Sequence, residues 1–136
     1  ILGYRVDELV GPIVVIGSGG VLSEVYDDKS IRIAPVNFKQ AKMMISEVKS
    51  SIIFDGFRGL PKTNIDILAR AIVKFSQLAF VKEIKEAEIN PVIIKKEGIV
   101  AVDGLINLSW YFFGQFLKTN KIYIYLLNNY FIINWW

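Results

Sequence analysis

The sequence AEINPVIIKKEGIVAVDG (residues 87–104) reads as two apolar strands around a turn, with oxygen-bearing side chains placed near the strand ends. If Lys96 and Glu97 are the central residues of a tight turn, the hairpin pairs Asn90 directly with Asp103. Glu88 lies two residues before Asn90 and therefore on the same face of its strand. Directly opposed side chains have Cβ atoms roughly 4.5 to 5.5 Å apart, close enough to reach one cation. Their amide and carboxylate oxygens predict a magnesium site that water or phosphate completes.

Two alternatives to this hairpin site are open. Gly98 permits a bulged turn that shifts the register by one residue, so that the three side chains converge less closely. Polar residues are also ordinary at solvent-exposed strand ends, and Asn90-Pro91 is by itself a turn signal. The spacing therefore predicts a site, with a solvated strand edge as the competing interpretation.

The rest of the chain alternates between strand and helix patterns. Short β-branched runs predict strands, and apolar residues at helical spacing predict two helices whose caps are Asn37 and either Thr63 or Asn64. The expected strands are residues 11–17 and 30–36 and a strand-like start at 52–55, and the expected helices are residues 38–51 and 65–81. With the hairpin at the end, this order predicts an α+β fold in which two helices pack against a mostly antiparallel sheet.

Composition excludes several classes of chemistry. The chain has 136 residues, a net charge of +3, no Cys and no His. It cannot form a disulfide, a thiolate site or a Ser-His or Cys-His catalytic pair, and its scattered basic residues argue against nucleic acid as a partner. We see no signal peptide, and expect a cytoplasmic protein that is a piece of something longer.

Residues 107–136 differ in composition from the preceding part. They hold most of the aromatic residues of the chain and no acidic residue. Three interpretations are open: a membrane anchor, an added strand or helix that completes a core, or a spurious extension of the kind that A/T-rich DNA encodes past a frameshift. Lysine and asparagine residues interrupt the apolar runs, which disfavours a membrane span.

Four segments, in order, resemble one family. The hairpin is similar to the magnesium-binding hairpin of ATP-grasp ligases in the succinyl-CoA synthetase branch. GPIVVIGSGGVLSEVYDD, SIRIAPV, IIFDGFRGLPKTNIDILARAIVKFSQLA and EAEINPVIIKKEGIVAVDG together resemble the ATP-grasp domain of ADP-forming acetyl-CoA synthetase β subunits. The resemblance covers residues 11–106 and implies the C-terminal half of an ATP-grasp domain. Residues 1–10 fit the family poorly, and residues 107–136 form an atypical tail.

The resemblance also implies roles for the hairpin residues and the cofactors they bind. Asn90 and Asp103 match the family's magnesium ligands, which join the metal to the phosphates of ATP or ADP. Glu88 matches the acidic residue of the same strand, a ligand in many ATP-grasp enzymes.

Three further residues fall in motifs beside the family's nucleotide cleft. Glu24, Arg32 and Arg58 are therefore expected to contact phosphate or the metal network. A surface salt bridge for Arg32 and a loop-bracing hydrogen bond for Arg58 are the structural alternatives. The run from Gly17 to Gly20 could present backbone amides to a phosphate, or could simply make a strand-to-strand turn.

The implied function is part of an ADP-forming acetate-CoA ligase. Such enzymes convert acyl-CoA, ADP and phosphate to acid, CoA and ATP, with a histidine carrying the phosphoryl group. This chain lacks the N-terminal ATP-grasp subdomain and any histidine, so we expect a fragment that is inactive alone and needs the missing half and the CoA-binding subunit or domain. The alternatives are a non-catalytic interaction module on a decayed ATP-grasp half, and a small protein attached to a membrane through residues 107–136.

Overall fold

The computed structural model describes most of the chain. It covers residues 1–19, 27–56, 58, 63–95 and 98–109, and the backbone of residues 123–127 and 130–134. Two X-Pro peptide bonds are cis, Ala34-Pro35 and Asn90-Pro91.

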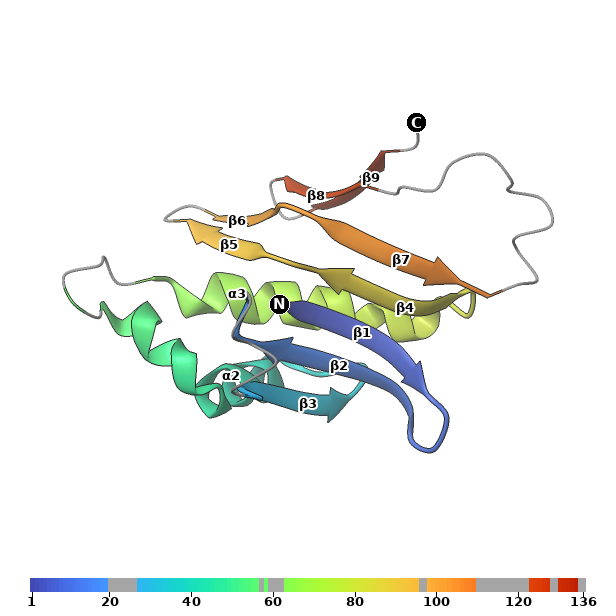
Figure 1. Cartoon of the computed structure of the whole chain (residues 1–136), viewed down its shortest axis with the longest axis horizontal. Coiled ribbons are helices and arrows are strands. Elements are labelled where there is room, and N and C mark those ends of the chain that lie inside the picture. The colour runs from blue at the N-terminus through green and yellow to red at the C-terminus, as the bar shows by residue number, and fades with distance from the viewer. Residues whose placement is uncertain are drawn as a thin grey trace.

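A five-stranded antiparallel sheet organises the fold (Figure 1). Its order is β3-β2-β1-β4-β7, so the first strand of the chain lies at the centre. The strands are β1 (Leu2–Asp7), β2 (Gly11–Gly17), β3 (Lys29–Ile33), β4 (Ile84–Ile89) and β7 (Gly104–Leu108). The segment 1–10, expected to fit the family poorly, supplies the strand that joins β2 to β4.

The first helix, α2 (Phe38–Glu47), begins at the predicted cap. The Asn37 side chain accepts a hydrogen bond from Gln40 N at 2.9 Å, and the Gln40 side chain accepts one from Asn37 N at 2.9 Å. This reciprocal pair satisfies two amides that a helix N-terminus otherwise leaves without partners.

The strand-like start expected at residues 52–55 is wrong. These residues belong to a 3-10 segment, η1 (Lys49–Asp55), that follows α2 directly. Ile52 and Ile53 are 59% and 45% exposed, so this β-branched run does not find a place in the sheet core. The first amides of η1, those of Lys49 and Ser50, donate to the carboxylate of Asp28, which holds this 3-10 segment in place.

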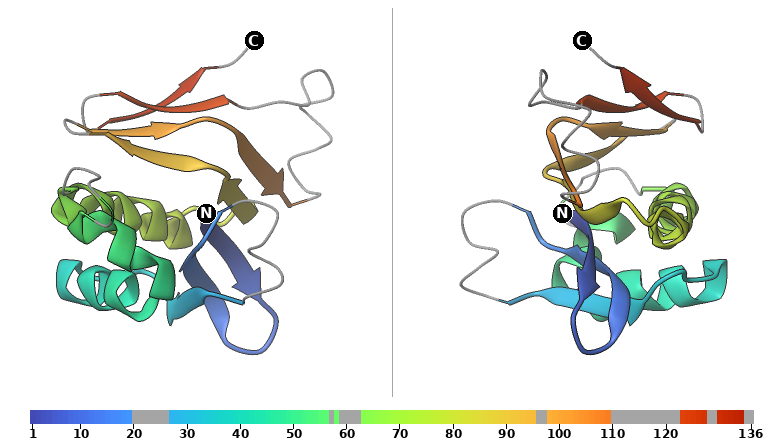
Figure 2. Two further views of the ribbon diagram at one scale, coloured as in Figure 1. Left: turned by 60° about the vertical axis from the view of Figure 1, so that its left-hand side comes forward. Right: turned by 90° about the vertical axis from the view of Figure 1, so that its right-hand side faces the viewer.

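The second helix, α3 (Ile65–Ser76), provides most of the helical part of the core. Asn64 accepts a hydrogen bond from Asp66 N at 3.1 Å, which makes it the predicted cap. A 3-10 turn, η3 (Gln77–Phe80), continues the helix. Both α-helices lie on one face of the sheet (Figure 1, Figure 2). The largest fully buried side chains are those of Leu2, Val14, Met44, Ile72, Phe75, Ser76 and Ile89.

The hairpin continues two strands beyond the main sheet (Figure 1). β4 leads into β5 (Val92–Lys95), and β6 (Gly98–Ala101) leads into β7. In the tail, β8 (Tyr123–Leu127) pairs with β9 (Tyr130–Asn134), and β8 lies beside β6. None of the helices in the described part is long and apolar enough to cross a membrane. The predicted α+β fold with two helices against an antiparallel sheet is confirmed.

Candidate functional site

The register of the hairpin places Asn90 opposite Asp103. β5 pairs Val92 with Ala101, and β4 pairs Ile89 with Gly104. Between these pairs, Asn90 N donates to Asp103 O at 3.0 Å. The unbulged register predicted from the sequence is therefore confirmed, and the register shifted by one residue is not formed.

Two of the predicted metal ligands, Glu88 and Asn90, share the face of the sheet that the helices leave open. Ile89 is fully buried, so the alternation of the strand turns its neighbours Glu88 and Asn90 to the opposite face. Asn90 Nδ2 donates to Glu88 Oε1 at 3.3 Å, which confirms that these two side chains lie together. Asp103, opposite Asn90, is exposed and accepts a hydrogen bond from Gly104 N at 2.8 Å through Oδ1.

The available oxygens at this face fit a hard cation. Asn90 Nδ2 points to Glu88, which leaves Asn90 Oδ1 as an acceptor, and Asp103 Oδ2 makes no hydrogen bond or ion pair within the described residues. In the same part of the chain, no group of three or more Asp, Glu, His or Cys side chains is placed to hold a metal ion. Carboxylate and amide oxygens are ligand types that suit magnesium, which takes one or two carboxylates together with water and substrate phosphates.

Gly19, two residues after the end of β2, lies near the Asn90 side chain. A Cβ atom built on Gly19 would lie 3.7 Å from Asn90 Oδ1 and 3.8 Å from Ile1 N. The Ile1 amine donates to Gly17 O at 2.8 Å. Burial lowers the pKa of this amine, and the nearby Glu88 carboxylate opposes that shift. Glu88, Asn90 and Gly19 thus lie in one neighbourhood.

The glycine-rich run mainly closes the connection between β2 and β3. Gly17 N donates to Ile1 O at 3.1 Å, and Ser18 N donates to Asp28 O at 3.0 Å. These two amides are used within the fold and are not presented to a phosphate. The strand-to-strand turn proposed as the alternative agrees with this part of the run, and Gly20 lies outside the described residues.

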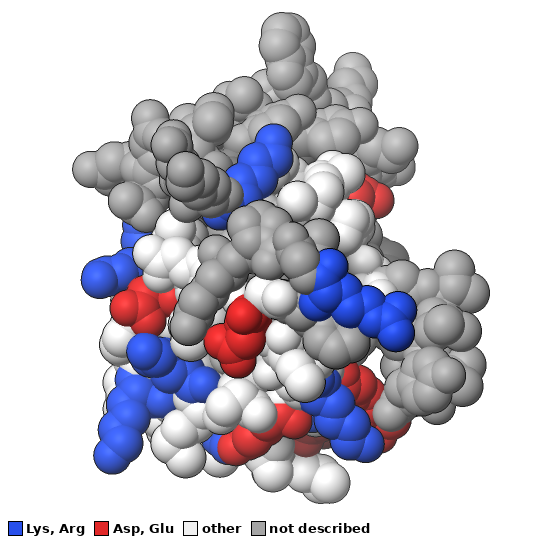
Figure 3. All heavy atoms as spheres, turned by 90° about the vertical axis from the view of Figure 1, so that its left-hand side faces the viewer, with Lys and Arg blue, Asp and Glu red and all other residues white. Residues whose placement is uncertain are grey.

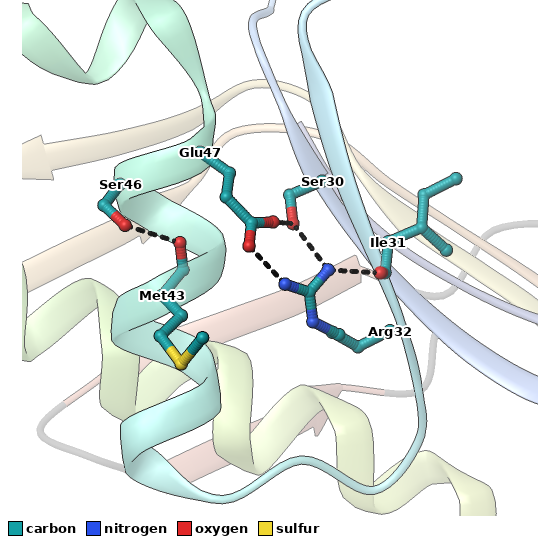
Figure 4. A network of polar contacts seen from close by, with 6 residues as sticks. All are labelled: Ser30, Ile31, Arg32, Met43, Ser46 and Glu47. Atoms are coloured by element: carbon teal, nitrogen blue, oxygen red, sulfur yellow. Dashed lines mark hydrogen bonds and ion pairs between the residues drawn. The ribbon is translucent and has the colours of Figure 1, made fainter.

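Arg32 belongs to a network between β3 and α2 (Figure 4). Its guanidinium forms an ion pair with Glu47 and donates to Ile31 O at 2.8 Å. Ser30 Oγ donates to Glu47 Oε2 at 2.6 Å. The Ser30 hydroxyl, and after it the Arg32 guanidinium, holds the pKa of the Glu47 carboxyl below its usual value.

Arg32 and the hairpin ligands lie on opposite faces of the sheet. Arg32 is in register with Val14, Tyr4 and Ala87, which are all buried beneath the helices. Glu88 follows Ala87 directly and therefore points to the other face. The structure does not bring Arg32 to Asn90, and the surface salt bridge is the contact that it shows.

Of the two other residues expected beside the nucleotide cleft, the structure describes Arg58 but not Glu24. Arg58 is exposed, follows η1 closely and has a left-handed backbone with φ 53°. Glu24 lies outside the described residues. Their expected contacts to phosphate stay predictions.

Sequence reasoning missed the role of Asp28, which lies directly before β3 and contacts the residue before Gly19. The sequence around Asp28 indicates only a turn, but its carboxylate accepts hydrogen bonds from Ser18 Oγ at 2.7 Å, Lys49 N at 2.6 Å and Ser50 N at 2.9 Å. The Ser18 hydroxyl is the largest contribution that lowers the Asp28 pKa to about 2. Nothing local in the sequence signals a contact between Asp28 and the amides more than twenty residues away.

Charges of both signs are mixed on the surface. On the face drawn in Figure 3, the described Lys and Arg side chains lie interspersed with Asp and Glu. This face does not carry a basic stripe of the type that binds nucleic acid.

Comparison with known proteins identifies the family to which the chain is similar. The family model described as an ATP-grasp domain matches residues 1–108. Acetate-CoA ligase [ADP-forming] I subunit beta of Pyrococcus furiosus is 41% identical over 104 residues, covering 76% of this chain and 45% of the relative. The 4-hydroxybutyrate-CoA ligase [ADP-forming] of Nitrosopumilus maritimus is 36% identical over 99 residues, covering 72% of this chain and 14% of the relative.

A solved structure agrees in fold. Dinucleotide forming acetyl-coenzyme A synthetase 1 of Ca. Korarchaeum cryptofilum, in complex with coenzyme A and Mg-AMPPCP, superposes with a TM-score of 0.76 at 37% identity. The match covers 79% of this chain and 51% of that chain. The chain spans about half the length of the β subunit and of the solved chain that it matches. It belongs to the ATP-grasp domain family and is related to ADP-forming acetyl-CoA synthetase β subunits, of which it covers a part.

Proposed function

We propose that the chain contributes a magnesium-nucleotide binding half site to an ADP-forming acyl-CoA ligase of the acetate-CoA ligase type. The observation that carries this is the pairing of Asn90 with Asp103 where β4 leads into β5, joined by the hydrogen bond between Asn90 N and Asp103 O. A related synthetase of the same fold was solved with Mg-AMPPCP, which supports a nucleotide as the ligand.

Each hairpin residue has a distinct part in this proposal. Asn90 Oδ1 and Asp103 Oδ2 would hold the cation, because both oxygens lack a partner within the described residues. Glu88 orients the Asn90 amide through its hydrogen bond and adds negative charge beside it. When bound, magnesium neutralises charge on the nucleotide phosphates. Arg58 and Glu24 are proposed to contact the nucleotide, and Arg32 could do so only by leaving Glu47.

The proposal includes partners that this chain does not contain. Because the chain spans about half of the β subunit, we propose that the other ATP-grasp half covers the nucleotide and that a CoA-binding subunit or domain completes the enzyme. The fragment is expected not to turn over alone. We propose a cytoplasmic location for this enzyme.

The test is calorimetric titration of the 136-residue chain with Mg-ADP. The titration is run alone and with the N-terminal half of the Pyrococcus furiosus β subunit added in trans. Asp103→Ala should weaken binding at least about 10-fold, since even indirect partners of a metal contribute about 10- to 100-fold. Glu86→Ala is the control, because it removes an exposed carboxylate from the same strand as Glu88 and should leave affinity unchanged. If wild type binds no Mg-ADP in either arrangement, or if both variants lose affinity equally, the half site is refuted.

A further inference from the structure

The connection from β2 to β3 is tied down at one carboxylate. Ser18 follows β2 directly, and Asp28 precedes β3 directly. Ser18 N donates to Asp28 O at 3.0 Å, and Ser18 Oγ donates to Asp28 Oδ2 at 2.7 Å. Backbone and side chain of the same pair therefore close this connection at its base.

The same carboxylate also holds the start of η1. Asp28 Oδ1 accepts a hydrogen bond from Lys49 N at 2.6 Å, and Oδ2 accepts one from Ser50 N at 2.9 Å. The hydroxyls of Ser18 and Ser50 are hydrogen-bonded to each other at 2.8 Å. Hydrogen bonds to an ionised carboxylate are stronger than those between neutral groups, so Asp28 is a firm joint between the two segments.

This joint is next in the chain to Gly19, which lies near Asn90 of the hairpin. Gly19 follows Ser18, and a Cβ atom at Gly19 would lie 3.7 Å from Asn90 Oδ1. Gly19 therefore lies beside the oxygen end of the Asn90 side chain with no side chain of its own between them, and Asn90 Nδ2 donates to Glu88 Oε1. A movement of Ser18 would change the position of Gly19 relative to the Asn90 side chain.

We propose that Asp28 is a positioning residue for the magnesium-nucleotide site: through Ser18 it holds Gly19 against Asn90 and so keeps Asn90 Oδ1 aimed for a cation. This inference rests on the proposed function for its ligand, but not for the closeness of Gly19 to Asn90. Asp28 acts through Ser18 and Gly19 and touches neither metal nor nucleotide.

Asp28→Asn is the sharpest perturbation of this joint. In the wild type, each carboxylate oxygen accepts from a backbone N–H, one from Lys49 and one from Ser50. Whichever way the new amide is turned, its NH2 group faces one of these donors. Glu47→Gln is the matched control, because Glu47 also accepts from a serine hydroxyl and joins β3 to α2, but on the helix-covered side away from Asn90.

The experiment follows the full 15N-labelled chain by NMR, with Mn²⁺ as a paramagnetic probe of the magnesium site. Without metal, Asp28→Asn should shift the Asn90 side-chain amide and Gly19 amide signals, and Glu47→Gln should not. With Mn²⁺, Asp28→Asn should raise the concentration that half-broadens the Asn90 signals about 10-fold or more, as for other indirect partners of a metal. Unchanged Asn90 signals and an unchanged Mn²⁺ midpoint in Asp28→Asn would overturn the proposal.

Two further outcomes keep the inference separate from the proposed function. If Mn²⁺ does not broaden Asn90 in the wild type, the proposed function fails, and the metal-free signals of Asn90 and Gly19 still decide whether Asp28 positions them. If Asp28→Asn does not fold, Ser18→Ala replaces it, because that variant removes only the hydroxyl between the joint and Gly19. Ser18→Ala should move the Asn90 signals in the same direction, and an unchanged Asn90 in this variant refutes the mechanism.

Discussion

Two serines make the same local hydrogen bond in different surroundings, and this contrast permits a sharp stability prediction. Ser76 Oγ in α3 donates to Val73 O at 2.7 Å, and Ser46 Oγ in α2 donates to Met43 O at 2.7 Å (Figure 4 shows the second). Only Ser76 is fully buried, and its oxygen also accepts a hydrogen bond from Val36 N at 3.0 Å.

The structure sets the size of the expected effect. Ser76→Ala leaves the buried Val36 N–H without a partner, and such an unsatisfied donor costs about 1–3 kcal/mol. Ser46→Ala exposes nothing buried and gains helix propensity, so it should be neutral or slightly stabilising by up to about 0.5 kcal/mol. For a chain of 136 residues, about 1 kcal/mol corresponds to roughly 3–4 °C in Tm. Ser76→Ala should therefore melt about 3–14 °C below Ser46→Ala.

The assay is thermal and urea unfolding of both variants beside wild type, followed by circular dichroism. A shift of the urea midpoint without a change in slope shows that stability, and not the extent of unfolding, has changed. If Ser76→Ala is as stable as Ser46→Ala, the Val36 N–H bond does not link the start of α2 to the end of α3, and the reasoning is refuted.

Three other perturbations test the fold and its pH dependence. Asn37→Ala removes the acceptor of the Gln40 amide and should cost about 1 kcal/mol in urea unfolding; a cost near zero would mean that the capping box contributes nothing. Phe75→Ala should cost about 3–5 kcal/mol because Phe75 is fully buried, whereas Phe80→Ala, at a residue 72% exposed, should change stability little; equal costs would contradict the assigned core. Folding lowers the pKa of Asp28 from 3.8 to about 2, so its stabilisation is complete above about pH 4 and is lost as pH falls towards about 2. Asp28→Asn should accordingly lose less stability than wild type between about pH 5 and pH 2, and parallel losses would exclude that contribution.

Local features of the chain were predictable from sequence because their causes are local. The Asn37 and Asn64 caps need only a side chain and amides within three residues. The register that sets Asn90 opposite Asp103 follows from a turn and the two-residue period of the strands. This is why the candidate metal ligands can be named from the order of the residues, whereas the structure decides between the direct pairing and the register shifted by one residue.

The relation between distant segments depends instead on how the chain packs. The run at 52–55 has the composition of a strand, but the amides just before it donate to Asp28 and the segment forms a 3-10 turn. Arg32 lies in a family motif, yet its place in the register turns it to the helix-covered face and to Glu47.

The amino-acid sequence alone set most of the element types, the helix starts and the hairpin pairing, because each depends on contacts between near neighbours. The packing of the sheet decided that β1 is its central strand, that Arg32 and Asn90 face opposite sides, and that Asp28 joins β2, β3 and η1. These features depend on contacts between residues far apart in the chain, which form only when the sheet and the helices bury a common core.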